Sequence, residues 1–79
     1  MDADNLVRMA NRIAEFFAAM PDHDEAVDGV ATHLRKFWAP VMRQDLLAQV
    51  AASGDPAALG LHPLVAEARA RHGEALRPV

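Results

Sequence analysis

Two consecutive segments of the sequence place their apolar residues at helical spacing, and this periodicity constrains the fold more than any other feature. At about 100° per residue, the apolar side chains of each segment fall within one stripe of a helix. We expect both stripes to face the core. The first stripe comprises Leu6, Met9, Ala10, Ile13, Phe16, Phe17 and Met20, and the second comprises Val27, Val30, Ala31, Leu34, Phe37 and Trp38.

Local signals bound these two helices at residues 4–20 and 23–38. Pro21 ends the first helix, because the residue before a proline is pushed out of the α-helical region. Asp22, followed three residues later by Glu25, resembles a capping box at the start of the second. Gly29 lies inside the second helix and has two interpretations: a glycine that is merely tolerated, or a point where a neighbouring backbone approaches closely.

The second half of the chain has weaker helical signals. Pro40 can begin a third helix over 40–52, which the turn residues SGDP at 53–56 would end. His62 and Pro63 open a fourth, weaker helix over 63–72, with Gly73 as its stop and 73–79 as a mobile tail. No segment alternates as a strand would. We therefore expect an all-α fold with no sheet: one small helical bundle over 1–79, with three main helices and a weaker C-terminal one.

Composition excludes several classes of function. The net charge is −3, whereas nucleic-acid-binding domains normally carry a basic surface. No apolar run approaches the roughly 20 residues that span a bilayer, and the acidic start MDADN does not look like a secretory signal. The chain contains no cysteine, in keeping with a reducing compartment. We expect a cytoplasmic protein that binds neither nucleic acid nor membrane.

The residue types that carry out catalysis are not grouped in the sequence. The histidines, at 23, 33, 62 and 72, pair neither with one another nor with a carboxylate at the spacing of a helical metal site. Ser53 lies in an expected turn without a neighbouring base, and no glycine-rich phosphate loop is present. We expect no catalytic, cofactor-binding or metal-binding residue in this chain, which would therefore not be an enzyme by itself.

The stretch THLRKFWAPVMR, residues 32–43, combines large apolar side chains with cations around a proline. Periodicity turns Phe37 and Trp38 inward, yet aromatic residues, methionine and arginine are also enriched at protein interfaces. Both interpretations, core and contact surface, remain open at this point. If the stretch is a contact surface, the residues predicted to bind a partner are Arg35, Phe37, Trp38, Pro40, Met42 and Arg43.

Three segments resemble a known family. NLVRMANRIAEFF at 5–17, HLRKFWAPVMR at 33–43 and GLHPLVAEA at 60–68 are similar to the small delta subunit of cytoplasmic, NAD-dependent, molybdenum-containing formate dehydrogenases. The resemblance implies a non-catalytic accessory subunit that docks on the large, molybdenum-containing subunit and supports assembly or stability of the complex. It also implies that other subunits carry the molybdenum cofactor, iron–sulfur clusters, FMN and NAD. Without cysteine, this chain offers no thiolate to such groups.

Other roles remain to be weighed against permanent docking. One is a transient maturation chaperone that assists insertion of the molybdenum cofactor and then leaves. Another, from a different class, is a small helical nucleic-acid-binding module that would use Arg35, Lys36 and Arg43, which the net acidity disfavours. The isolated chain could also form a homodimer through an exposed apolar helix face.

Overall fold

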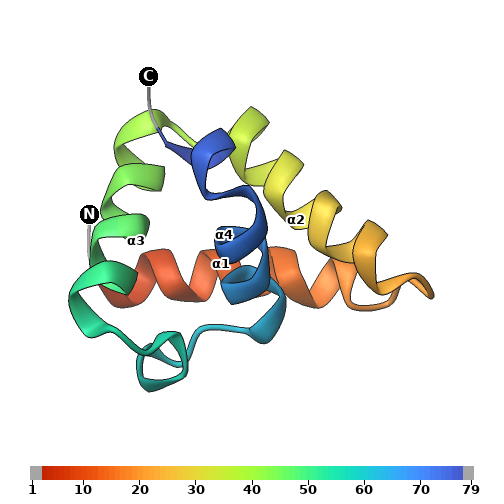
Figure 1. Cartoon of the computed structure of the whole chain (residues 1–79), viewed down its shortest axis with the longest axis horizontal. Helices are drawn as coiled ribbons and strands as arrows, with labels where there is room; N and C mark the ends of the chain where they lie inside the picture. Colours follow the sequence, from red (N-terminus) through yellow and green to blue (C-terminus); the bar gives the residue numbers. More distant parts are fainter. Residues whose placement is uncertain (1–2, 78–79) are drawn as a thin grey trace.

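The fold is made of four α-helices and one short 3-10 turn. A computed structural model of the chain describes residues 3–77 and contains no strand in that range, which confirms the all-α prediction. The elements are α1 (Ala3–Phe17), α2 (His23–Phe37), α3 (Pro40–Ser53), η1 (Pro56–Leu59) and α4 (Pro63–Leu76) (Figure 1).

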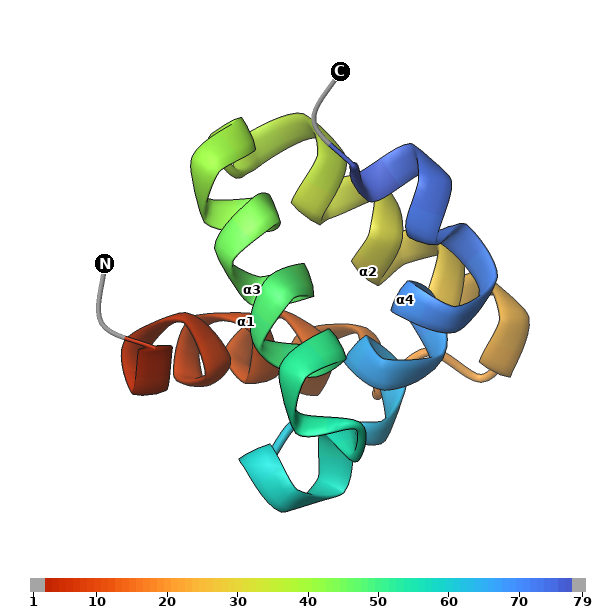
Figure 2. The ribbon, with the colours of Figure 1, turned by 60° about the vertical axis from the view of Figure 1, so that its left-hand side comes forward.

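The longest helix–helix contact joins α2 and α4, which are separated by α3 in the sequence. In Figure 1, α1 runs below this pair and α3 stands at its left-hand side. Seen from a second side in Figure 2, α3 and α4 face each other with α2 behind them. The described part of the molecule measures 31 × 27 × 19 Å along its principal axes.

Short-range capping explains where most helices start. Asp22 Oδ1 accepts a hydrogen bond from the Glu25 N–H at 3.1 Å, so the expected cap of α2 is present. His62 Nδ1 accepts from the Leu64 N–H at 3.0 Å and caps α4. Prolines occupy the first turns of α3, η1 and α4, where their missing N–H is not needed.

One side chain ties the connection between α3 and α4 to α1. Asn11 Nδ2 donates to the carbonyl oxygen of Gly60 at 2.8 Å, and Asn11 Oδ1 accepts from the His62 N–H at 2.8 Å. The two ends of one amide therefore satisfy two backbone groups on either side of Leu61, whose side chain is buried. This contact fixes the start of α4 over the middle of α1.

Two helix ends differ from the prediction by more than one residue. α1 ends at Phe17 rather than Met20, and Ala19 and Met20 are held by tighter i to i−3 hydrogen bonds that lead into Pro21. α4 continues past Gly73 to Leu76, so the predicted stop at Gly73 is wrong and residues 73–76 are helical rather than a tail. The backbone leaves helical geometry at His72 (φ −122°, ψ 24°), and the next turn brings Leu76 into the core at 3% exposure. Residues 78 and 79 lie outside the described range.

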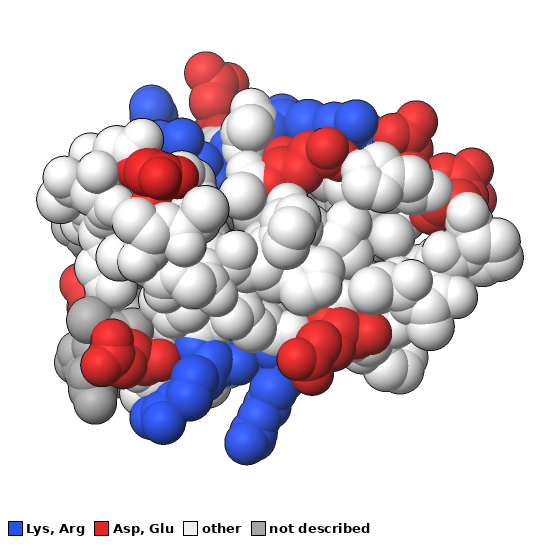
Figure 3. Space-filling model, turned by 90° about the horizontal axis from the view of Figure 1, so that it is seen from below, with Lys and Arg blue, Asp and Glu red and all other residues white. Residues whose placement is uncertain are grey.

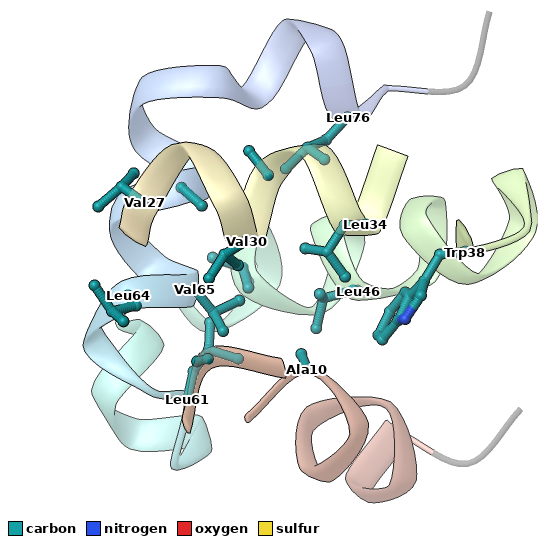
Figure 4. Close-up of a cluster of buried hydrophobic side chains, with 14 of the residues drawn as sticks. Ala10, Val27, Val30, Leu34, Trp38, Leu46, Leu61, Leu64, Val65 and Leu76 are labelled. Atoms are coloured by element: carbon teal, nitrogen blue, oxygen red, sulfur yellow. The ribbon is translucent and has the colours of Figure 1, made fainter. Parts of the chain in front are cut away.

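All four helices contribute to one hydrophobic core (Figure 4). Several of the buried residues are alanines, whose small side chains let helix backbones approach one another. The buried residues are Leu6, Val7, Ala10, Ala14, Ala26, Val27, Val30, Ala31, Leu34, Trp38, Leu46, Val50, Leu61, Leu64, Val65, Ala68 and Leu76.

The apolar stripe of α1 is rotated relative to the prediction. Its fully buried line passes through Leu6, Ala10 and Ala14, and it includes Val7, which the periodicity did not select. The larger side chains Met9, Ile13, Phe17 and Met20 are only half-buried at the edge of the core, and Phe16 is 74% exposed. Ala10 and Ala14 are completely buried, so the neighbouring elements cover α1 along its alanine line and leave the bulky residues on its flank.

Phe37 also differs from the prediction, because its side chain is 72% exposed rather than inward. It follows Gly29 and His33 at intervals of four residues, so all three share the flank of α2 rather than its buried face. Trp38 lies just beyond the helix with an extended backbone, and it is only 7% exposed. Figure 4 shows its indole pointing toward the side of the core that holds Ala10 and Leu46.

Phe17 lies directly against Gly29 of α2. A Cβ atom at Gly29 would lie 2.5 Å from two ring carbons of Phe17, closer than carbon atoms can pack. The close approach expected as one of two interpretations of Gly29 is therefore present, but it comes from a side chain rather than a backbone. Gly73 in α4 has no atom within 4 Å of the same position.

Replacing Trp38 should unfold much of the population. We expect Trp38→Ala to lower the free energy of unfolding by about 3–5 kcal/mol, as large-to-small core substitutions do, whereas Phe37→Ala should change it by less than about 0.5 kcal/mol. Urea titration followed by far-ultraviolet circular dichroism measures both. Equal effects of the two substitutions would show that Trp38 does not have the core role described above.

The Gly29 contact predicts an unusual response to alanine. Gly29→Ala should lower the free energy of unfolding by about 1 kcal/mol, because the Phe17 ring must move, although alanine favours helix. Gly73→Ala, the matched control in open space, should raise it by up to about 1 kcal/mol. In a Phe17→Ala background, Gly29→Ala should become stabilising. If Gly29→Ala stabilises the chain that keeps Phe17, the Phe17 ring moves aside without a cost in free energy, and the prediction is wrong.

Candidate docking surface

Four aromatic rings form a continuous row on the surface where α1 and α2 cross. The ring centroids of Phe16 and Phe17 are 5.1 Å apart, those of Phe17 and His33 are 6.3 Å apart, and those of His33 and Phe37 are 4.8 Å apart. The first two contacts are edge-on, an arrangement that aromatic rings prefer. We call Phe16, Phe17, His33 and Phe37 the aromatic row.

Each half of the aromatic row is positioned by one helix. Phe16 and Phe17 are the last two residues of α1, and His33 and Phe37 lie on successive turns of α2. Gly29, one turn before His33, leaves room for the Phe17 ring and thereby joins the two halves. The row is exposed at both ends, at Phe16 and Phe37, and half-buried in the middle.

Cationic side chains flank both ends of the aromatic row. Arg12 precedes Phe16 by one helical turn, and Lys36 adjoins Phe37. Both side chains are exposed, and neither forms a hydrogen bond or ion pair with any residue in the range 3–77. The surface therefore combines an apolar centre with a positive edge, as interfaces with acidic partners do.

The predicted partner-binding residues occupy different environments. Phe37 belongs to the aromatic row, whereas Trp38 is in the core. Arg35 and Pro40 are exposed, and Met42 is half-buried against the core. The structure therefore joins only Phe37 of this set to the row.

Arg43 has an internal contact that the sequence did not predict. Its Nη1 donates to the carbonyl oxygen of Arg35 at 3.0 Å, which satisfies one of the last carbonyl groups of α2. Arg43 Nε is buried without a hydrogen-bond partner in the described structure. This arginine therefore holds α2 and α3 together at the corner formed by Ala39 and Pro40.

Sequence reasoning did not include Phe16 and His33 among the candidate contact residues. Phe16 and Phe17 are adjacent, so they project about 100° apart and cannot both point at the centre of one helix face. His33 follows Gly29 and precedes Phe37 at intervals of four, which would have marked a second face of α2. These two spacings were the available signals.

A seam of ion pairs joins α2 to α4 on another side of the molecule. Arg71 Nη1 lies 2.6 Å from Asp24 Oδ1, and Arg71 Nη2 lies 3.4 Å from Glu67 Oε2. His23 Nε2 is 2.5 Å from Glu67 Oε2, and His72 Nε2 is 2.7 Å from Asp28 Oδ1. Sequence spacing could not reveal these histidine–carboxylate pairs, because their partners come from different helices.

The Arg71–Asp24 pair shifts the pKa of both groups. The hydrogen bond and the charge of Arg71 lower the pKa of Asp24 below its ordinary value, and the hydrogen bond to Asp24 raises the pKa of Arg71. The seam does not resemble a metal centre, since no group of three histidine, aspartate or glutamate side chains within residues 3–77 has a suitable arrangement.

Two further features of the surface are a groove between two helices and an uncharged area between charged edges. An open groove between α3 and α4 is lined by small residues such as Ala48, Ala51 and Ala70, together with Arg69 and Arg77. In Figure 3, the face seen from below carries charged side chains along its edges and uncharged ones between them. The large apolar side chains that are most exposed within the described range are Phe16, Phe37 and Val41.

The matched family agrees with the resemblance seen in the sequence. Residues 5–69, which span the whole aromatic row, match the family described as the NADH-dependent formate dehydrogenase delta subunit, FdsD. The chain belongs to this family. Members of the delta subunit family are parts of an oxidoreductase complex with other subunits. No curated protein and no solved structure gives a significant match.

Two further observations bear on this delta-subunit chain. None of the helices within residues 3–77 is long and apolar enough to cross a membrane. The chain has no cysteine and thus no thiolate ligand for an iron–sulfur cluster or molybdenum.

The seam should give stability a specific acid dependence. Because the folded-state pKa of Asp24 is lowered, its pairing contributes fully above the ordinary pKa near 3.8 and is lost as the pH falls through the lower folded-state value. We therefore expect Asp24→Asn to reduce stability at neutral pH and to make the loss of stability below about pH 4 less steep. Urea midpoints measured from pH 7 to pH 2 provide the comparison.

The control for this pH series is Glu74→Gln. Glu74 is exposed and has no ion pair within residues 3–77. Glu74→Gln should leave the pH dependence of stability nearly unchanged. Superimposable acid profiles for Asp24→Asn and the unmodified chain would contradict the assigned role of the pair.

Proposed function

We propose that this chain is a non-catalytic accessory subunit that docks on the molybdenum-containing large subunit of formate dehydrogenase in the cytoplasm. In this role it supports assembly or stability of the complex. The family match over residues 5–69 is the observation that carries the proposal. Two phenylalanines that are each more than 70% exposed also support it. Large apolar side chains that are exposed together mark interaction surfaces.

The chemistry of the proposed complex lies in other subunits. The molybdenum cofactor, iron–sulfur clusters, FMN and NAD would be bound there, since this chain provides neither cysteine nor a cluster of metal ligands within its described residues. A stable subunit contact should bury at least roughly 1,000 Å². A contact of that size needs an extended exposed surface on this chain.

The corner predicted from the sequence can contribute in two ways. Phe37, Arg35, Pro40 and Met42 are accessible or partly accessible and can form direct contacts. Trp38 and Arg43 act from within, because the first packs in the core and the second holds the α2–α3 corner. Their substitution would weaken docking by disturbing the surface rather than by removing a contact.

Co-expression tests this function. The large subunit and its enzymatic partners are produced with and without this chain, and the complex is purified through a tag on the large subunit. We expect the chain to co-purify at about equal stoichiometry, and we expect its omission to reduce the yield of intact complex, its molybdenum content or its formate-dependent NAD reduction. Molybdenum is measured by mass spectrometry and complex size by light scattering.

The quantities that fall when the chain is omitted distinguish permanent docking from transient help during maturation. Less molybdenum per large subunit, with the chain absent from the mature complex, indicates transient help during maturation. Normal molybdenum with less intact complex indicates permanent docking. If the chain never co-purifies, and its omission changes none of these quantities, the proposed function is wrong.

A further inference from the structure

We propose that the aromatic row, with Arg12 and Lys36 beside it, is the surface by which this chain binds the large subunit. We also propose that the partner surface is an apolar segment flanked by carboxylates. This inference rests on the proposed function, and it moves the centre of the contact from the α2–α3 corner to the crossing of α1 and α2. It assigns contact roles to Phe16, Phe17 and His33.

The fold does not account for the exposure of the aromatic row. Phe16 and Phe37 leave 74% and 72% of their surfaces in water, although the core contains many alanines. The rings nevertheless have a defined arrangement, since each contacts the next and Phe17 is seated on Gly29. A preorganised apolar surface loses little side-chain entropy when a partner covers it.

The charges next to the aromatic row identify the chemistry of the partner. The carboxylates of Asp24, Asp28 and Glu67 are engaged with Arg71, His72 and His23 in the α2–α4 seam. Arg12 and Lys36 have no such counterpart within residues 3–77. Glu15 adjoins Phe16 in the sequence as Lys36 adjoins Phe37, and it forms no ion pair with Arg12 or with any other residue in the range 3–77. Carboxylates on the partner would complete these two ion pairs.

The same charges disfavour a second copy of the chain as the occupant. If two aromatic rows met face to face, Arg12 and Lys36 of one copy would lie near the same cations of the other. Like charges brought together at an interface oppose association. A different subunit with an acidic edge fits the surface, whereas a symmetric homodimer does not.

The test uses the full chain and a formate dehydrogenase complex purified from cells that lack it. Phe16→Ser combined with Phe37→Ser removes the exposed ends of the aromatic row, and Arg12→Glu combined with Lys36→Glu reverses its cations. All four side chains are exposed, so the variants should fold, which circular dichroism and urea unfolding verify. Affinity and association rate are measured by surface-coupled binding at several salt concentrations.

Matched controls come from other parts of the surface. Arg69→Glu with Arg77→Glu makes the same change in net charge at the α3–α4 groove. Val41→Ser replaces another exposed apolar residue, between the predicted contacts Pro40 and Met42. We expect the phenylalanine pair to weaken binding by at least about 30-fold. We expect the cation pair to slow association and reduce its salt dependence, and the controls to stay within about threefold of the unmodified chain.

Three outcomes would overturn the inference in different ways. If the unmodified chain does not bind the complex, both the proposed function and this inference fail. If it binds and the folded phenylalanine variant binds within about threefold of it, the function stands and the docking surface lies elsewhere. If light scattering shows a dimer that the phenylalanine substitutions dissociate, without any change in binding to the complex, the aromatic row is occupied by a second copy.

Discussion

The packing of α2 against α4 is the contact on which the remaining structure depends. Val27, Val30 and Leu34 on α2 and Val65 and Ala68 on α4 are nearly inaccessible to solvent. Exposed ion pairs at the edge of this contact add little energy individually. α1 and α3 pack onto this pair, and Asn11 fastens the start of α4 to α1. The packing of these four helices determines which side chains lie on the surface.

The sequence predicts the helices better than it predicts their faces. Helical spacing, Asp22 and the prolines located the helices, because these signals act within a few residues along the chain. Which part of an apolar stripe becomes buried depends on how closely other helices approach. In α1 the line through Ala10 and Ala14 is buried and Phe16 is exposed. Periodicity alone could not have shown which part of the stripe would be covered. The end of α4 was missed because burial of Leu76 extends it beyond the kink at His72.

The candidate surface was predictable only in part. Phe37 was identified from its position in an aromatic and basic segment, and the family resemblance was carried by the same stretch. The contact of Phe17 with Gly29, and hence the continuity of the rings, depends on the crossing of two helices and has no signature in either helix alone. Likewise, Arg43 resembled a surface cation, although its guanidinium contacts the end of α2.

The division of labour between the two halves of the chain has a consequence for how such a subunit can change. All members of the aromatic row and both of its cations come from residues 12–37, whereas α3, η1 and α4 supply none. The second half instead completes the core and secures the helix that carries half of the row. Substitutions in α4 can therefore change the stability of the fold while the composition of the proposed docking surface stays the same. Substitutions at Phe16 or Phe37 can alter the proposed docking surface with little effect on folding.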